Sequence, residues 1–250
     1  MILLRSLVFN LVFYLWMAVL GTLCLPVLLL PRRYAWAVGR LYLRQILALL
    51  RILIGLDYRI RGAEHLPHGA AIVAMKHQSA WDTLILPLLF ADPAVVLKRE
   101  LLWLPLYGWW QMKLGMIAVD RGAGARALKQ IVAQARRALA DGRTIVIFPQ
   151  GTRTPPGSTH PYQPGLAALY LQTGVPVVPV ALNSGLFWPR RSFLRRPGTI
   201  TVEILPPIAP GLGRAAFQAR LEQAVEGATS RLELEESGDK PASETAESRG

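Results

Sequence analysis

The chain has 250 residues, of which 52% are hydrophobic, and a formal net charge of +12. Its mean hydropathy of +0.31 is high for a freely soluble protein, and its length suits one sizeable domain with appendages. The single cysteine, Cys24, excludes an intramolecular disulfide framework and a cysteine-based metal cluster. The four histidines show no His-Glu-x-x-His spacing, so we predict no metal site.

The first predicted element is a long apolar segment. Residues 6–30 contain no charged side chain, and crossing a membrane takes only about 20 apolar residues. A cleaved signal peptide and a buried core helix are the alternatives. We favour a membrane anchor, because the run continues beyond any small-residue cleavage site and is too long and uniform for a core helix. Arg32 and Arg33 follow at once and favour the cytoplasmic side for everything downstream.

The next segment, residues 34–56, is apolar but is interrupted by Arg40, Arg44 and Arg51. Arginines spaced through an apolar helix are typical of a helix that lies in the headgroup region of a membrane. We therefore predict that residues 1–56 form a helical membrane anchor.

Residues 57–231 alternate between strand-like and helix-like patterns. Apolar side chains recur at helical spacing in residues 128–139, 166–173 and 217–225. This alternation predicts an α/β fold with a mostly parallel sheet flanked by helices, and functional loops at the strand ends. The predicted strands are residues 58–61, 71–75, 94–97, 116–119, 144–148, 175–182 and 199–205.

His77 precedes Asp82 by five residues, directly after the strand predicted at 71–75. Imidazole accepts a proton near neutral pH, and a carboxylate can fix its tautomer, so the pair suits general-base catalysis. On a regular helix the two side chains would lie roughly 140° apart, so they meet only if the chain turns between them. Ser79 followed by Asp82 is also a helix capping signal. The spacing alone leaves both interpretations open.

Two candidate contacts come next in the chain. Lys98 directly follows a predicted strand, where it is either a phosphate contact or part of an exposed charge cluster. Asp120 and Arg121 end the strand predicted at 116–119 and precede Gly122. They form either a surface ion pair of little energetic consequence or a substrate contact.

Residues 142–153 (Gly-Arg-Thr-Ile-Val-Ile-Phe-Pro-Gln-Gly-Thr-Arg) combine a predicted strand with a Pro/Gly turn. The turn ends in Arg153. A glycine turn beside a planar guanidinium is suited to binding an anion.

The end of the chain is acidic. Residues 232–250 hold six acidic and two basic side chains, a net charge of −4, which leaves +16 on residues 1–231. We predict that this tail is disordered, because its composition cannot bury enough apolar area. The basic remainder favours nucleic acid or an anionic membrane surface. Nucleic acid would not explain the apolar first segment and no binding motif supports it, so we predict a membrane surface as the partner and no nucleic acid.

Four ordered motifs resemble the glycerolipid acyltransferase family, most closely the bacterial 1-acyl-glycerol-3-phosphate acyltransferases. The family pattern is a histidine, four residues and an aspartate; an apolar strand ending in arginine; Phe-Pro-Glu-Gly-Thr-Arg; and a Val-Pro-Val-Pro-type strand. Each motif alone is weakly specific, but four in this order are specific. Their counterparts here are residues 77–82, 115–121, 148–153 and 175–180.

The resemblance implies an acyltransferase domain at residues 57–231 that esterifies the free hydroxyl of 1-acyl-sn-glycerol 3-phosphate, giving phosphatidate. His77 would be the general base and Asp82 would hold its imidazole. Acyl-CoA or acyl carrier protein would be the co-substrate, with no cofactor. Related enzymes use an N-terminal helical pair to sit in one leaflet, which implies a monotopic anchor, with a full membrane span as the alternative. Together with Arg32 and Arg33, this predicts a location on the cytoplasmic face of the inner membrane. The expected substrate-binding residues are Lys98, Arg121, Gln150, Gly151, Thr152 and Arg153.

Gln150 departs from the family motif, which has glutamate at this position. Glutamine keeps the shape and the hydrogen-bonding capacity but carries no charge, so it can orient a glycerol hydroxyl but cannot act as a charged base. The substitution leaves another lysolipid, such as a lyso-amino-acid lipid, open as the acceptor. The alternative from another class is a non-catalytic basic membrane-binding protein, which would not explain the ordered motifs.

Overall fold

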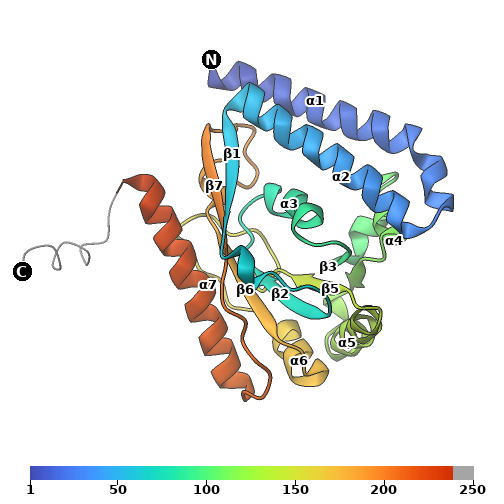
Figure 1. Cartoon of the computed structure of the whole chain (residues 1–250), viewed down its shortest axis with the longest axis vertical. Helices are drawn as coiled ribbons and strands as arrows, with labels where there is room; N and C mark the ends of the chain where they lie inside the picture. The colour runs from blue at the N-terminus through green and yellow to red at the C-terminus, as the bar shows by residue number, and fades with distance from the viewer. Residues whose placement is uncertain (239–250) are drawn as a thin grey trace, which may run out of the picture.

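A computed structural model describes residues 1–238 of the chain, without the side chain of Arg121. This part contains a seven-stranded sheet with helices packed on both faces (Figure 1). The strands are β1 (Leu56–Arg61), β2 (Ala71–Met75), β3 (Pro93–Lys98), β4 (Ile117–Val119), β5 (Thr144–Ile147), β6 (Val177–Leu182) and β7 (Gly198–Ile204). The α-helices are α1 (Ile2–Leu23), α2 (Arg32–Leu49), α3 (Trp81–Leu89), α4 (Tyr107–Lys113), α5 (Ala125–Ala140), α6 (Pro164–Thr173) and α7 (Arg214–Ser237).

The sheet is mostly parallel, which confirms the predicted fold class. Its strand order is β1-β7-β6-β2-β5-β3-β4, and every neighbouring pair is parallel except β6 and β7. Each of the seven predicted strands is present, within two residues of its predicted ends. β2 lies between β6 and β5 and all its residues are buried, because a central strand of a parallel sheet is covered on both faces.

Alternate residues of the central strands face two apolar cores. Val73 and Met75 of β2 belong to a core shared with α1, α2 and α3. Ile72 and Ala74 of the same strand belong to a second core, formed with α5, α6 and α7. Successive residues at the end of β2 therefore point to opposite faces of the sheet, one toward α3 and the next toward α7.

α1 and α2 pack on the domain as a helical pair, side by side across one end of the molecule (Figure 1). α2 continues as a π-helical turn (Leu50–Ile54) and ends at Gly55, whose φ of +76° lets the chain turn into β1. Leu50, Ile54 and Leu56 are all buried in the first core. The predicted boundary between residues 56 and 57 thus divides the chain by hydropathy but does not divide the core.

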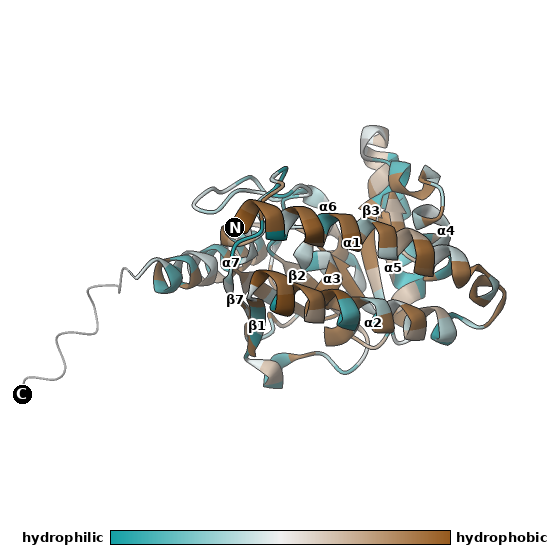
Figure 2. Cartoon of the chain, turned by 90° about the horizontal axis from the view of Figure 1, so that it is seen from above, coloured by the Kyte–Doolittle hydropathy of each residue, from teal (hydrophilic) through white to brown (hydrophobic). Residues whose placement is uncertain are grey.

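α1 is apolar along nearly its whole length (Figure 2). Among the described residues it is the one helix long and apolar enough to cross a membrane, and only 17% of its most apolar window is buried. Ser6, Phe9 and Asn10 form its buried side. The remaining apolar side chains of α1 are therefore largely uncovered by the rest of the chain.

α7 extends to Ser237, into the segment 232–250 that the sequence predicts to be disordered. This part of the prediction is wrong, because Leu232 is buried and Glu233 accepts hydrogen bonds from Gln78 and from the backbone nitrogen of Gly157. Composition averages over a segment and does not register one buried leucine and one paired glutamate. Residues 239–250 of the predicted tail lie outside the described residues.

Candidate active site

His77 and Asp82 meet because the chain turns between them, as their spacing requires. β2 ends at Met75 and α3 begins at Trp81, so the pair spans a strand-to-helix junction. Nδ1 of His77 lies 2.8 Å from Oδ2 of Asp82, whose side chain is fully buried, whereas the His77 side chain is 12% exposed. This contact favours the tautomer with its proton on Nδ1, and Nε2 is then the nitrogen that can accept a proton.

Asp82 is held by three further donors. The backbone nitrogens of Gln78 and Ser79 donate to Oδ2 at 2.7 and 2.8 Å, and the hydroxyl of Ser184 donates to Oδ1 at 2.5 Å. The hydroxyl of Ser79 also accepts from the backbone nitrogen of Trp81, at the start of α3. The N-cap residue of α3 is Ala80, which makes no side-chain capping bond, so the hydrogen bonds of Ser79 lie one residue before the cap. These bonds and the contact between His77 and Asp82 coexist in one segment.

Ser184 was not predicted as a site residue, because it lies 102 residues from Asp82 in the sequence and no local pattern marks it. We expect Ser184→Ala to lower kcat about 10-fold, since a buried acceptor that loses its donor costs about 1–3 kcal/mol and Asp82 would hold the imidazole less firmly. Steady-state kinetics and thermal unfolding measure the two effects separately. Ser230→Ala, an exposed serine of α7, is the matched control. An unchanged kcat for Ser184→Ala would contradict this role.

The loop after β5 is fixed against His77. The ring of Phe148 stacks on the imidazole with 4.0 Å between the ring centroids, and the backbone nitrogen of Thr154 donates to the His77 carbonyl at 2.8 Å. Gly151 has a φ of +68°, a left-handed conformation that favours glycine. The turn places Gly151, Thr152 and Arg153 on the lining of the same cavity as His77. Two motifs far apart in the sequence thus form one site.

Gln150 lies behind this loop, not in the cavity. Its side chain is buried, its Nε2 donates to Glu226 of α7 at 3.2 Å, and its Oε1 accepts from the hydroxyl of Thr154 at 3.3 Å. The expected contact between Gln150 and a glycerol hydroxyl does not match this placement, because the protein itself uses both ends of the amide. Gln150 instead supports, from inside, the loop that carries Arg153.

A cavity of about 1180 Å³ opens beside His77. It is larger than the roughly 300–1,000 Å³ typical of small-molecule sites. Its walls come mainly from α1, α2, α3, β3, α4 and α5, and most of them are apolar. They include Phe13, Leu20, Trp36, Leu43, Leu84, Leu97, Trp110 and Ile131. A space of this size and character can enclose a long hydrocarbon chain.

The charged side chains that line the cavity are all basic. They are Lys98, Arg153, Arg190 and Arg191, and within residues 1–238 no aspartate or glutamate lines it. Arg190 donates to the backbone carbonyl of Arg153 at 3.0 Å. This bond links the segment of Arg190 and Arg191 to the turn after β5. Arg190 and Arg191 were not among the predicted substrate contacts, although the basic composition of their loop was a usable signal. Basic side chains thus border the apolar space, and Arg153 and Arg190 lie side by side.

Tyr107 lies on the same lining as Arg153. Burial raises the pKa of Tyr107, although the nearby charge of Arg153 acts in the opposite direction, so its hydroxyl remains a hydrogen-bond donor beside the arginine.

Arg121 begins a short 3-10 helix (Arg121–Ala123) just after β4. Its side chain lies outside the described part, so its contact with substrate stays a prediction. Among the described residues, no group of three or more His, Cys, Asp or Glu side chains is arranged to hold a metal ion.

A family model described as Acyltransferase matches residues 57–183, just over half of the chain. The chain belongs to the acyltransferase family. A 1-acyl-sn-glycerol-3-phosphate acyltransferase of Pseudomonas aeruginosa is 39% identical over 202 residues, which are 80% of this chain and 78% of that protein. The alpha form of Mus musculus is 30% identical over 198 residues, covering 78% of this chain and 69% of its own.

This acyltransferase also shares its fold with a solved structure. The crystal structure of the 1-acyl-sn-glycerophosphate (LPA) acyltransferase from Thermotoga maritima matches with a TM-score of 0.76, over 92% of this chain and 95% of that chain, at 24% identity. The region matched by the family model includes His77, Asp82 and Arg153. Ser184 and all of α7 lie beyond it, so the contacts that these parts of the acyltransferase make with Asp82, Gln78 and Gln150 come from outside the family match.

Proposed function

We propose that this acyltransferase moves a fatty acyl group from a thioester donor to the free hydroxyl of 1-acyl-sn-glycerol 3-phosphate, making phosphatidate for phospholipid synthesis. The names of the relatives from Pseudomonas aeruginosa and Mus musculus support this acceptor. The observation that carries the proposal is the lining of the cavity, where His77, a long apolar wall and four basic side chains adjoin one space. An acyl chain joined to a phosphate is complementary to that combination.

The proposed reaction is direct acyl transfer. Nε2 of His77 takes the proton of the acceptor hydroxyl as its oxygen attacks the thioester carbonyl. The tetrahedral intermediate then collapses, the bond between the carbonyl carbon and sulfur breaks, and the leaving thiolate receives the proton from the imidazolium. Asp82 stabilises the positive imidazole in between. The acceptor oxygen is itself the nucleophile, so no covalent acyl-enzyme is required.

The acceptor phosphate is proposed to bind at the turn after β5. Arg153 offers a planar guanidinium that can hold a phosphate through two hydrogen bonds, and Lys98 adds a point charge on the same lining. Gly151 and Thr152 belong to the turn that presents Arg153, and Arg121 is proposed as a further contact. Acyl-CoA or acyl carrier protein is proposed as the donor, and no cofactor or metal ion is assigned a role.

A lysolipid panel tests this function. Detergent-purified protein is incubated with a labelled acyl thioester, first as acyl-CoA and then as acyl carrier protein, and with each lysolipid separately. The expected product is labelled phosphatidate from 1-acyl-sn-glycerol 3-phosphate, with much slower transfer to monoacylglycerol and to a lyso-amino-acid lipid. Preference for the lyso-amino-acid lipid would favour the alternative acceptor, and no transfer to any lysolipid would favour a non-catalytic membrane-binding protein.

We propose that the enzyme works on the cytoplasmic face of the inner membrane, with α1 lying in one leaflet. Polar contacts attach α1 to the domain in its first half and near its C-terminal end. Asn10 donates to the carbonyl of Phe193 at 2.9 Å and accepts from Arg195 at 2.8 Å, and Trp110 donates to the carbonyl of Gly21 at 3.2 Å. A helix attached at these two places is favoured to lie along the domain surface, where it does not cross the bilayer.

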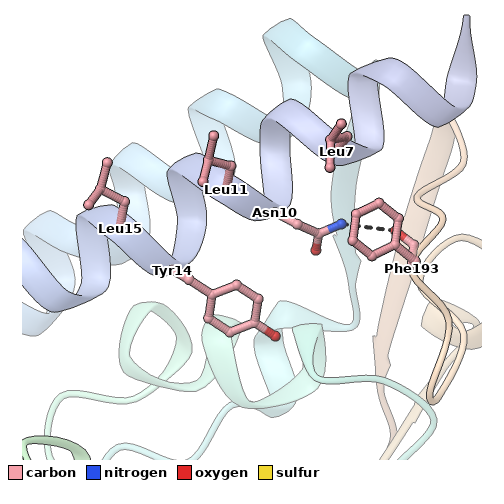
Figure 3. A pocket seen from close by; sticks show the side chains of 6 residues that line it. All are labelled: Leu7, Asn10, Leu11, Tyr14, Leu15 and Phe193. Atoms are coloured by element: carbon pink, nitrogen blue, oxygen red, sulfur yellow. Dashed lines mark hydrogen bonds between the residues drawn. The ribbon is translucent and has the colours of Figure 1, made fainter.

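The outer side of α1 is then the surface that enters the lipid. Figure 3 shows Asn10 turned toward Phe193, with Leu7, Leu11 and Leu15 directed away from the domain. The three leucines are 50%, 66% and 59% exposed, which is unusual for large apolar side chains on one face of a helix. A lipid leaflet would cover them.

We expect high salt to leave the protein in the membrane fraction and detergent to release it. Burial contributes roughly 1.5–3 kcal/mol for each large apolar side chain, and each basic residue near anionic lipid adds about 1 kcal/mol. Salt screens the second contribution but not the first. Fractionation of membranes followed by immunoblotting measures the release.

The variant Leu7→Ser/Leu11→Ser/Leu15→Ser tests the same anchor without disturbing the core, since all three leucines are exposed. We expect salt to release a larger share of this variant than of the wild-type protein. Leu234→Ser, which replaces an exposed leucine of α7, is the matched control. Quantitative release of the wild-type protein by salt alone would overturn the anchor.

A further inference from the structure

The side chains on both sides of His77 are bound by α7, which contributes no residue to the lining of the cavity. Lys76 and Gln78 reach Glu226 and Glu233 of this helix. Nζ of Lys76 lies 2.5 Å from Oε2 of Glu226, and Nε2 of Gln78 lies 2.6 Å from Oε1 of Glu233. Because the two glutamates are seven residues apart, they lie on the same face of α7.

Glu226 is the centre of a buried polar cluster. Lys76 is 1% exposed, and within residues 1–238 Glu226 is its one ion-pair partner. The same carboxylate accepts hydrogen bonds from Nε2 of Gln150 at 3.2 Å and from the hydroxyl of Tyr162 at 2.9 Å. Burial, reinforced by the negative charge of Glu226, raises the pKa of Tyr162, so this hydroxyl stays a donor. A buried cation with one carboxylate partner is strongly destabilised when that partner is removed.

Two members of this cluster adjoin the residues of the proposed mechanism. Lys76 directly precedes His77, and Gln150 directly precedes the turn that ends in Arg153. We propose that Glu226 is a positioning residue, whose carboxylate fixes the segment of His77 and the turn of Arg153 relative to each other from the opposite face of the sheet. This inference rests on the proposed function, because it concerns the alignment of the general base with the phosphate contact.

The proposal also accounts for the uncharged residue at position 150. A glutamate there would place a second carboxylate beside Glu226, where the Gln150 amide nitrogen now lies 3.2 Å from it. The buried cluster would then hold two acids and one lysine, and like charges at such a distance repel each other strongly. Gln150 and Glu226 are therefore a matched pair, in which the negative charge comes from α7 and not from the turn.

A charge exchange between the two positions tests the proposal. Glu226→Gln removes the ion pair of Lys76, which keeps its hydrogen bond to the carbonyl of Ser158, and Gln150→Glu adds a second carboxylate to the cluster. The double variant Gln150→Glu/Glu226→Gln keeps a single carboxylate in the cluster but moves it from α7 to the turn. We expect each single variant to lower kcat by about 10-fold or more, and the double variant to recover kcat to within about fivefold of the wild type. The acceptor KM should rise in both single variants and fall back in the double variant.

Glu236→Gln, which removes an exposed carboxylate from the same helix, is the matched control and should leave kcat unchanged. Thermal unfolding and kcat per folded molecule are measured for every variant. Single variants that unfold more easily but keep wild-type kcat and KM would show a merely structural role and overturn the proposal. A double variant no better than the single ones would overturn it as well. If a single variant does not fold, the double variant decides alone, because it retains one carboxylate and one lysine in the buried cluster.

The wild-type enzyme is assayed in parallel with 1-acyl-sn-glycerol 3-phosphate and with the other lysolipids of the panel. If it makes no phosphatidate but acylates another lysolipid, the proposed acceptor is wrong, and the charge exchange is then measured with the lysolipid that reacts. Failure of the proposed function and failure of the positioning role are thus separate results.

Discussion

Replacing His77 with alanine is expected to lower kcat about 10²- to 10⁴-fold, the usual loss when a positioned general base is removed. The protein should remain folded, because the imidazole borders the cavity and is partly exposed. Asp82→Asn should also lower kcat, since the amide cannot stabilise the positive imidazole. Initial rates of phosphatidate formation at saturating substrates measure both effects.

The matched control for this prediction is His160→Ala. His160 is exposed, and its ring contacts only the backbone carbonyl of Thr159 among the hydrogen bonds of residues 1–238. Its replacement should leave kcat unchanged, which separates loss of the His77 imidazole from loss of any histidine. Near-normal turnover by the His77→Ala protein would show that His77 is not the base.

Replacing Arg153 with alanine is expected to raise the KM for 1-acyl-sn-glycerol 3-phosphate by about 10- to 100-fold, with a much smaller change in the KM for the acyl donor. Hydrogen bonds to charged groups contribute about 1.5–3 kcal/mol, which corresponds to that range. Arg153→Lys should restore the KM only in part, because a point ammonium does not reproduce the planar contact with phosphate. Steady-state kinetics with each substrate varied in turn provide the measurement.

Two comparisons make this prediction specific. Arg220→Ala removes an exposed arginine of α7 and should leave both KM values unchanged, which controls for the loss of one positive charge. Monoacylglycerol lacks the phosphate, so Arg153→Ala should change the slow rate of acyl transfer to monoacylglycerol only slightly. If Arg153→Ala raised the KM for the charged and for the uncharged acceptor by the same factor, Arg153 would have a structural role.

The sheet could be predicted from the sequence because its central strands are short apolar runs bounded by Gly, Pro and charged residues. Residues 71–75 are an example, since β2 has the predicted bounds. The antiparallel pairing of β6 with β7 was not predicted, because hydrophobic runs give no strand direction. Nor did hydropathy reveal that Leu50 and Ile54 of the predicted anchor are buried in the core of the domain. The hydropathy of an apolar residue is the same whether lipid or protein covers its side chain.

The cavity side of the site was easier to predict than its support. His77, Asp82 and Arg153 belong to local motifs, and the turn between strand and helix brings the first two together. The side-chain contacts of Ser184 and Glu226 join positions more than 60 residues apart, so no local spacing records them. The one local signal was Gln150, whose missing charge could have prompted a search for a compensating glutamate elsewhere in the chain.

Direct transfer through His77 is tested most directly by rapid mixing of the purified enzyme with a labelled acyl donor, followed by acid quenching and separation of protein from lipid. The expected result is labelled phosphatidate when 1-acyl-sn-glycerol 3-phosphate is present, and no label bound covalently to the protein when it is absent. Acyl label that accumulates on the protein without acceptor, and moves to the acceptor when it is added, would contradict direct transfer. Absence of labelled phosphatidate at every time point would contradict the assigned acceptor.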